Sequence, residues 1–289
     1  MYAAEPAPRS RRGSGRGAGG GAGGRGARVA LVDSGLGLVS YAEALLTLRP
    51  DLSLVLSLDP DNMPYGPRTP AQVRRLILES ARSTLAYDPD AIVVACNTAS
   101  VHGLEALRAE FEPGIPIIGT VPAIRPAAAT GGPVAVWATS ATTSSDYLRG
   151  LIDAFAADLE THAVPARGLA EAIESADLAA VDACIAAATA STPPGVRALV
   201  LGCTHYGLVA DRIAAAMGES VTIFDSPIGV ARQTLRRLGL DPDISPDPAA
   251  PVGSIEAVLL SGRPGVLPAS LATYPAGARL LAAVDRSGG

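Results

Sequence analysis

Two short apolar runs, each ending on a cysteine, decide how this sequence is interpreted. The run ALVLGCTHYGL spans residues 198–208 and places Cys203, a threonine and a histidine directly after a stretch with the character of a buried strand. The run AIVVACNTAS spans residues 91–100 and repeats this arrangement at Cys96. A single cysteine is a common core residue. Two similar strand ends that each carry a thiol predict a functional site instead.

Strand-like and helix-like runs alternate on either side of these two stretches. The segments ARVALVDSGLGL (27–38) and LSLVLSLD (52–59) have the pattern of strands. A helix is expected over 70–87, with Thr69 as its cap and a proline in its first turn, and another over 101–111. Such alternation predicts an α/β fold with mainly parallel sheets wrapped by helices.

The same pattern begins again after a Pro/Ala/Gly-rich segment at 125–133, which we interpret as a crossing between two lobes. We expect two pseudo-equivalent α/β lobes with the active site in the cleft between them. The first comprises residues 27–120 plus 225–285, and the second residues 121–224.

Residues 1–26 are rich in glycine and arginine and have no apolar stretch of the kind found in a signal peptide. We expect this segment to be a disordered, solvated tail rather than a nucleic-acid-binding arm, and we expect its deletion to leave turnover unchanged.

Composition narrows the class of protein further. The chain has 289 residues, of which 48% are hydrophobic, and a formal net charge of −5. No apolar run approaches the roughly 18 residues of a membrane span. We therefore expect a cytoplasmic protein with a small-molecule ligand, and neither nucleic acid nor a membrane as partner. The three cysteines lie far apart, without the spacing of a disulfide framework, which favours reduced thiols.

The sequence contains no lysine, so all 23 basic residues are arginine. This excludes pyridoxal phosphate enzymes, lysine aldolases and Walker-type phosphate loops, which all need a lysine amine.

Polar residues gather where the predicted strands end, and in parallel sheets ligands bind at these carboxyl ends. These residues are Asp33, Ser34, Tyr65, Gly66, Cys96, Asn97, Thr98, Thr139, Thr142, Cys203, Thr204 and His205. Each alone has a structural explanation, such as a helix cap or a turn. Together they predict one site. We interpret Cys184, His102 and His162 as packing or surface residues.

Three chemistries fit a cluster of two cysteines, a histidine and an aspartate. A cysteine nucleophile with His205 as its base would give a hydrolase, but it leaves one thiol idle. Zinc binding is a second option, although nothing in the sequence resembles a CxxC zinc knuckle. In the third, the thiols face each other across a carbanion, one removing a proton and the other delivering one. This is racemisation, and it alone uses both thiols equivalently.

The motifs VDSGLG, PYG, VACNTAS, AT with a following threonine, and LGCTHY occur in this order between about Arg28 and Leu238. In order and spacing they resemble the cofactor-independent glutamate racemases of the aspartate/glutamate racemase superfamily. A C-terminal segment of that family is more weakly similar to IEAVLLSG. The resemblance implies racemisation of glutamate without cofactor or metal, supplying D-glutamate for peptidoglycan, and is compatible with a homodimer. Another amino-acid racemase of the superfamily, such as one for aspartate, and a non-catalytic amino-acid-binding protein are the alternatives.

The resemblance also implies roles for particular residues. Cys96 would handle the α-proton of the D-enantiomer with help from Asp33, and Cys203 that of the L-enantiomer with help from His205. Glu174 is the best match to an assisting glutamate of the family, and Glu171 the second. The residues implied in holding the substrate are Asp33, Ser34, Tyr65, Gly66, Asn97, Thr98, Thr139, Thr142, Thr204 and His205.

The sequence departs from the family pattern at two positions. Leu38 stands where a second glycine is usual, and Gly207 where a proline is common. Leu38 adds a side chain where the backbone is normally bare, which raises a question about loop geometry and substrate size.

Overall fold

The computed structural model describes residues 26–242 and 253–287. The predicted tail, apart from Gly26, lies outside these residues. None of the helices in the described part is both long and apolar enough to cross a membrane.

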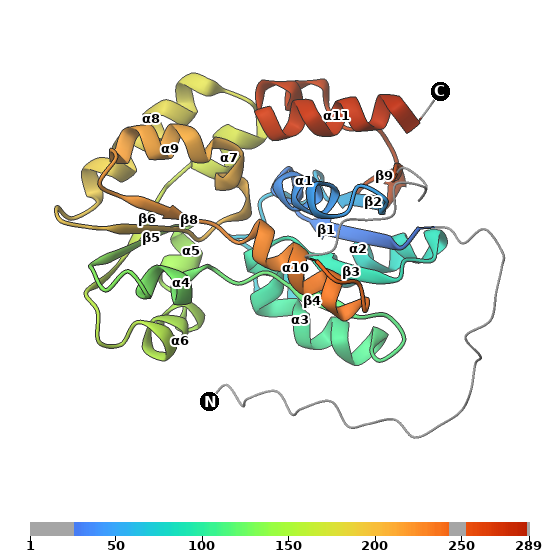
Figure 1. Ribbon diagram of the computed structural model, residues 1–289, viewed down its shortest axis with the longest axis horizontal. Helices are drawn as coiled ribbons and strands as arrows, with labels where there is room; N and C mark the ends of the chain where they lie inside the picture. The colour runs from blue at the N-terminus through green and yellow to red at the C-terminus, as the bar shows by residue number, and fades with distance from the viewer. Residues whose placement is uncertain (1–25, 243–252, 288–289) are drawn as a thin grey trace.

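The first sheet has six strands, five of them parallel (Figure 1). Only its short edge strand β10 runs antiparallel, against β9. The strand order is β10 (Arg263–Pro264), β9 (Ile255–Leu260), β2 (Ser53–Leu58), β1 (Arg28–Asp33), β3 (Ala91–Val94) and β4 (Ile117–Gly119).

The second sheet has four strands and is entirely parallel. Its order is β6 (Thr161–Pro165), β5 (Val134–Ala138), β7 (Ala198–Leu201) and β8 (Thr222–Phe224). The central strands β3, β5 and β7 are short, fully buried and apolar, as expected for sheets covered on both faces. The prediction of an α/β fold with mainly parallel sheets is confirmed.

Helices cover both faces of each sheet (Figure 1). They are α1 (Leu38–Leu48), α2 (Pro70–Thr84), α3 (Asn97–Phe111), α4 (Ile124–Ala128), α5 (Ser140–Thr143), α6 (Asp146–Phe155), α7 (Leu169–Glu174), α8 (Leu178–Ser191), α9 (Ala210–Met217), α10 (Pro227–Arg237) and α11 (Pro275–Ser287), with 3₁₀ turns η1 (Leu85–Tyr87), η2 (Thr204–Val209) and η3 (Ala269–Thr273).

Local sequence signals explain several of these helices. The predicted cap of α2 is confirmed: the Thr69 side chain accepts a hydrogen bond from Gln72 N–H, and the Gln72 side chain returns one to Thr69. Helix α3 begins at Asn97, four residues before the predicted 101–111, because the Cys96 carbonyl already accepts the Ser100 N–H. The segment 125–133, expected to be a plain crossing, contains most of α4.

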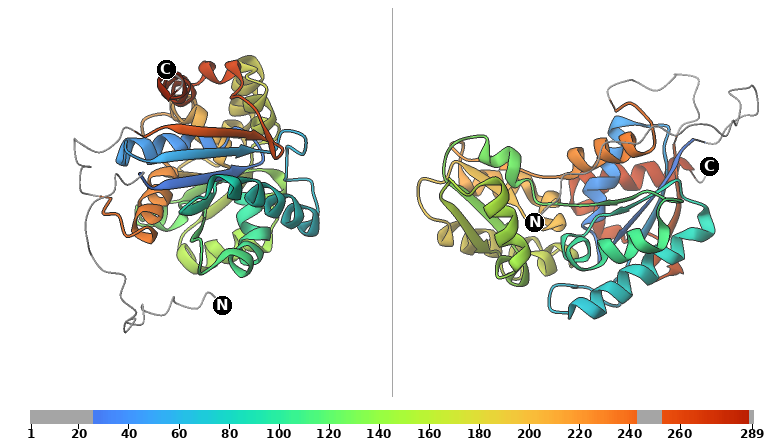
Figure 2. Two further views of the ribbon diagram at one scale, coloured as in Figure 1. Left: turned by 90° about the vertical axis from the view of Figure 1, so that its right-hand side faces the viewer. Right: turned by 90° about the horizontal axis from the view of Figure 1, so that it is seen from below.

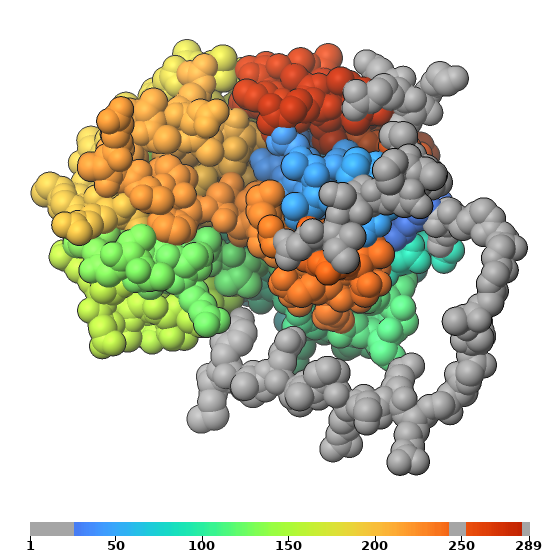
Figure 3. Space-filling model, viewed as in Figure 1, coloured from blue at the N-terminus to red at the C-terminus, as the bar shows by residue number. Residues whose placement is uncertain are grey.

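One apolar core runs through both halves of the molecule. It combines residues of β1 and β2 with residues of β5 and β7 and includes the fully buried Trp137 and Leu201. A second cluster packs α2 and α3 on the other face of the first sheet, and a third packs α4 and α6 on the other face of the second. Figure 3 shows α11 against both halves, and Tyr274, which precedes it, donates a hydrogen bond to the Ile173 carbonyl.

The chain passes between the sheets twice, after β4 and after β8, and Figure 2 shows both connections joining the two halves. A triangle of buried hydroxyls ties these connections to α1. Tyr41 Oη lies 2.9 Å from Thr120 Oγ1 and 2.7 Å from Ser226 Oγ, and the last two atoms are 3.2 Å apart. The exact lobe boundaries proposed above remain a prediction.

A candidate active site between two cysteines

Strand ends from both sheets meet at one small cavity. Cys96 follows β3 of the first sheet, and Cys203 follows β7 of the second. The residues that line the cavity are Ser34, Met63, Pro64, Tyr65, Gly66, Cys96, Asn97, Thr98, Thr139, Thr142, Ala170, Gly202, Cys203, Thr204 and His205. The structure therefore brings the two thiols, 107 residues apart in the sequence, to the walls of the same space.

Cys96 is buried and has a carboxylate partner. Its thiol hydrogen-bonds the fully buried Asp33, and its sulfur lies 3.9 Å from Ser34 Oγ. Asp33 is held in turn by the Ser34 N–H at 2.6 Å and faces Thr204 Oγ1 at 3.5 Å. Cys96 is also the N-cap residue of α3, and the nearby Ala99 N–H of the first turn acts to lower the pKa of its thiol. One thiol is thus placed between a helix start and a buried acid.

Cys203 has an imidazole partner instead. Its sulfur lies 4.0 Å from Nδ1 of His205, and Nε2 of the same ring lies 2.9 Å from Oε2 of Glu174. The strand ends at Leu201 and the chain turns into η2, which carries the His205 side chain back toward the sulfur.

The electrostatics of the Cys96 side favour a protonated thiol beside an ionised acid. Burial raises the pKa of Asp33 to about 6, although the nearby His205 and the Cys96 hydrogen bond oppose this. Burial also raises the pKa of the Cys96 thiol well above its usual range, and the Asp33 carboxylate raises it further. At neutral pH this arrangement leaves Cys96 as a proton donor.

The electrostatics beside Cys203 favour the protonated, positively charged form of His205. Burial by itself lowers the pKa of His205, but its contacts with Cys203 and Glu174 outweigh burial, and the net shift is upward. An imidazolium stabilises an adjacent thiolate, which is the form in which cysteine acts as a base. The two thiols therefore have partners of different kinds, a buried carboxylate and an imidazole, although they occupy equivalent places in the two sheets.

All the predicted substrate ligands except Asp33 line the cavity, and the two candidate glutamates, Glu174 and Glu171, lie outside the lining. The carboxylates of Asp33 and Glu174 lie behind the lining, against Cys96 and His205. The Tyr65 hydroxyl donates to Asp59 Oδ2 at 2.8 Å, so Tyr65 contributes its ring and backbone to the wall rather than a free hydroxyl. Glu171 lies on the exposed side of α7 and lines an outer pocket instead.

The sequence interpretation missed two glycines beside these groups. A Cβ at Gly37 would lie within 3.0 Å of Asp33, Thr204 and His205, and one at Gly35 would lie within 3.0 Å of the Glu174 carboxylate. Leu36, between them, donates its N–H to Glu174 Oε2 at 2.8 Å. The signal available in the sequence was the alternation of glycines directly after Asp33, which indicates close approach by other groups.

The two departures from the family pattern fall outside the cavity lining. Leu38 is fully buried in the large core, so its side chain does not narrow the cavity. A Cβ at Gly207 would lie 2.7 Å from Asp225 Oδ2 and 3.0 Å from Ser40 Oγ. Gly207 therefore leaves room for the Asp225 carboxylate beside α1.

The other thiol and imidazoles lie away from the cavity. Cys184 is half-buried on α8, His102 lies on α3, and His162 on β6 pairs with Glu160. Among residues 26–242 and 253–287, no group of three or more His, Cys, Asp or Glu side chains has the arrangement of a metal site.

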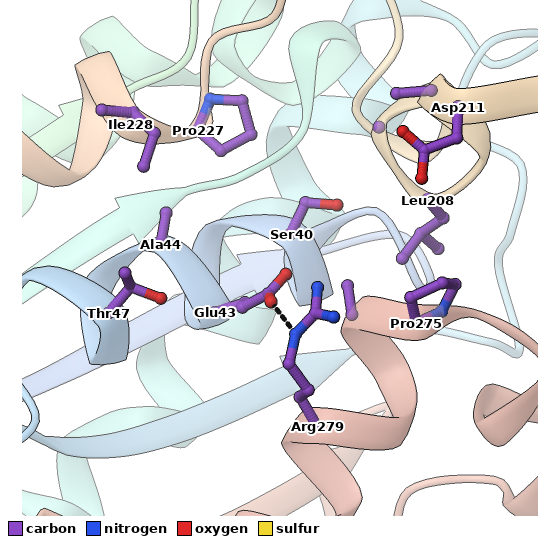
Figure 4. Close-up of a pocket in the computed structure, with 13 residues that line it drawn as sticks. Ser40, Glu43, Ala44, Thr47, Leu208, Asp211, Pro227, Ile228, Pro275 and Arg279 are labelled. Carbon is purple, nitrogen blue, oxygen red and sulfur yellow. Dashed lines mark hydrogen bonds and ion pairs between the residues drawn. The ribbon is translucent and has the colours of Figure 1, made fainter. Parts of the chain in front are cut away.

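Larger cavities lie elsewhere on the molecule. One of about 370 Å³ adjoins the cysteine cavity and shares Pro64, Gly66, Thr139 and Ala170 with it. Another, of about 360 Å³, lies between α1, α10 and α11 and is crossed by an ion pair between Glu43 and Arg279 (Figure 4). Neither has a thiol or an imidazole in its lining.

Comparison with known proteins places this geometry in a family. A family model described as Asp/Glu/hydantoin racemase matches residues 38–234, which include both cysteines. The chain belongs to this family. The racemase from Pseudomonas putida strain F1, named glutamate racemase, is 35% identical over 237 residues, covering 78% of this chain and 86% of the relative. A glutamate racemase from Clostridium perfringens is 35% identical over 219 residues, covering 74% and 84%.

Solved structures of this family share the fold. Escherichia coli glutamate racemase, described in complex with L-glutamate and the activator UDP-MurNAc-Ala, matches with a TM-score of 0.68 at 28% identity and covers 90% of this chain and 94% of that one. Glutamate racemase from Thermus thermophilus, in complex with β-chloro-D-alanine, matches with a TM-score of 0.64 at 27% identity, covering 89% and 93%. The arrangement of two mainly parallel sheets is therefore that of the racemase family.

Proposed function

We propose that this chain is a glutamate racemase that works without a cofactor, using Cys96 and Cys203 as an acid–base pair. The observation that carries the proposal is that the two thiols line one cavity, each with a separate proton-handling partner. A cysteine nucleophile would need only one of them. Membership of the racemase family and the names of the relatives support glutamate as substrate.

The proposed reaction moves one proton off the substrate and another onto it. In the L-to-D direction the Cys203 thiolate, stabilised by the His205 imidazolium, takes the α-proton, so the C–H bond breaks and an S–H bond forms. The Cys96 thiol then donates its proton to the opposite face of the carbanion and leaves as thiolate. The reverse sequence converts D-glutamate to L-glutamate.

The carbanion needs stabilisation because the α-proton of an amino acid is a very weak acid. Neutral donors surround the cavity: the Thr98 and Thr204 hydroxyls and the N–H groups at the start of α3. No arginine lines the cavity. A closed, largely dry space strengthens each of these hydrogen bonds.

The cellular role follows from the reaction proposed. D-glutamate is the product, and we infer that it serves peptidoglycan synthesis. The three cysteines are all free, which suits the reducing cytoplasm, where we place the enzyme. A homodimer remains a prediction, which sedimentation of the purified chain would test.

Optical rotation provides the primary test. Pure L-glutamate incubated with the protein is expected to lose its rotation completely, and Cys184→Ser, which changes the thiol outside the cavity, is expected to do the same. Unchanged rotation with tight binding of glutamate would support a non-catalytic binding protein, and loss of rotation with L-aspartate alone would support an aspartate racemase.

A further inference from the structure

A single buried hydrogen bond joins the neighbours of the two cysteines. Asn97, directly after Cys96, donates from Nδ2 to the carbonyl oxygen of Gly202, directly before Cys203, at 2.8 Å. The two residues belong to different sheets. We propose that Asn97 is a positioning residue that sets the separation of the two thiols and closes the site around the substrate, an inference that rests on the proposed racemase function.

The first-sheet end of this bond is held rigidly. Asn97 is the first residue of α3, and the Cys96 carbonyl accepts the Ser100 N–H at 2.8 Å. One residue earlier, the Ala95 N–H donates to the Val32 carbonyl at 2.9 Å. A shift of the Asn97 backbone therefore shifts the Cys96 sulfur with it.

The second-sheet end is equally constrained. The Gly202 N–H donates to the Trp137 carbonyl at 2.7 Å, and a Cβ at Gly202 would lie 2.9 Å from both that carbonyl oxygen and Ala138 Cβ. The Gly202 backbone is thus pressed against β5. Because both ends are fixed to their sheets, the length of the Asn97–Gly202 bond determines how far apart the two strand ends stand.

The cavity volume indicates that this bond opens during turnover. The space between the thiols measures about 30 Å³, room for about two waters but not for the ten heavy atoms of glutamate. The strand ends must therefore separate to admit the substrate. The Asn97–Gly202 bond spans the line of separation, so it breaks on entry and forms again on closure.

The second polar atom of the Asn97 side chain, Oδ1, is available to accept a hydrogen bond from the substrate. Asn97 Oδ1 is buried and has no hydrogen-bond partner among the described residues. An acceptor of this kind is satisfied by a donor. In glutamate at neutral pH the ammonium is the donor group, since both carboxylates accept. Asn97, already among the residues that the resemblance implies in holding the substrate, thus has Oδ1 left for the ammonium while Nδ2 holds the opposite sheet.

The test compares two rates in deuterated water: α-proton exchange without inversion, and racemisation. Exchange needs one correctly placed thiol, whereas inversion needs both at the right separation. Asn97→Asp keeps an acceptor and suits the first turn of a helix but loses the donor to Gly202. We expect racemisation to fall at least about 100-fold, the cost of a misplacement of roughly 1 Å, and exchange to fall less than about tenfold.

Asn97→Ser provides a second variant with a shorter side chain, and it is expected to show the same rise in the ratio of exchange to inversion. His102→Gln, on the same helix outside the cavity, is the matched control and should leave that ratio unchanged. If the two folded variants lose both rates in equal proportion, or lose neither, Asn97 does not act as a positioning residue. Racemisation by the wild type would still support the proposed function in that case. Absence of racemisation in the wild type overturns both.

Discussion

Nε2 of His205 lies 2.9 Å from Oε2 of Glu174, and the same oxygen accepts the Leu36 N–H at 2.8 Å. The carboxylate therefore joins the imidazole beside Cys203 to the loop that follows Asp33. It both orients the ring and favours its protonated form.

Replacing this carboxylate should weaken the Cys203 side of the site. Glu174→Gln removes the negative charge and lowers the pKa of His205. As the pH rises, the imidazolium therefore loses its proton at a lower pH than in the wild type. We expect kcat/KM to fall about tenfold or more and the alkaline limb of its pH profile to move toward acid. Glu171→Gln is the matched control and should change neither. Equal losses in the two variants would contradict the assignment of Glu174.

The two thiols should be separable by isotope exchange. In deuterated water, we expect Cys203→Ser to exchange the α-proton of D-glutamate slowly and to be inert toward L-glutamate, and Cys96→Ser to show the reverse. The reason is that a serine hydroxyl is far too weak an acid to supply the base. Racemisation should fall at least about 100-fold in both.

Proton NMR of each enantiomer with each variant measures these exchange rates, with Cys184→Ser as the control that keeps full activity. Full racemisation by either active-site variant would make that cysteine structural. Loss of all exchange in both folded variants would show that the thiols act only as a coupled pair.

Ionisation of Asp33 should set the acid limb of the reaction. Its carboxyl has a pKa raised to about 6, so it is protonated below that pH and cannot accept the Cys96 proton. Cys96 acts as the base only toward D-glutamate, so we expect kcat/KM for D-glutamate, which reports ionisations of the free enzyme, to rise with pH through about 6. Asp33→Asn should lack this limb and be slow at every pH. An unchanged limb in that variant would assign the ionisation to another group.

A methyl group at Gly37 should disrupt the site without disrupting the helix that follows it. Gly37 has φ −59°, which alanine adopts readily, so the effect of Gly37→Ala comes from contact with Asp33, Thr204 and His205. We expect turnover to fall about 100-fold. Gly150→Ala on α6 meets no atom within 4 Å and should keep full activity with up to about 1 kcal/mol of added stability. Racemisation and thermal unfolding measure the two effects. Normal turnover by Gly37→Ala would show that the loop after Asp33 rearranges to accommodate the methyl group.

Catalysis by two thiols should need no metal ion. Dialysis against a strong chelator is expected to leave the racemisation rate unchanged, and added zinc to inhibit by binding the thiolate. Loss of activity on dialysis, restored by zinc, would instead make the Cys203–His205 pair part of a metal site.

The sequence alone was sufficient wherever the signal is local. Short continuous apolar runs mark the buried strands, and the Thr69 cap lies three residues from the Gln72 that completes it. The position of Cys96 and Cys203 at strand ends follows from the same pattern, because the carboxyl ends of parallel strands lie at one edge of a sheet. The α/β class and the main site residues could be predicted on this basis.

Only the tertiary structure decided which side chains meet. Whether Glu174 or Glu171 reaches His205 depends on which side of α7 faces η2, and the Tyr65 hydroxyl turns toward Asp59 because that carboxylate is within reach. The Asn97–Gly202 bond joins residues 105 positions apart.

The physical reason is the range of the interactions. Strand and helix patterns arise from neighbours along the chain, so they are written in consecutive residues. Hydrogen bonds across the cleft, the burial that raises the pKa of Asp33 and the contact that excludes a side chain at Gly37 depend on atoms that folding brings together, and the spacing of residues in the sequence contains no measure of those distances.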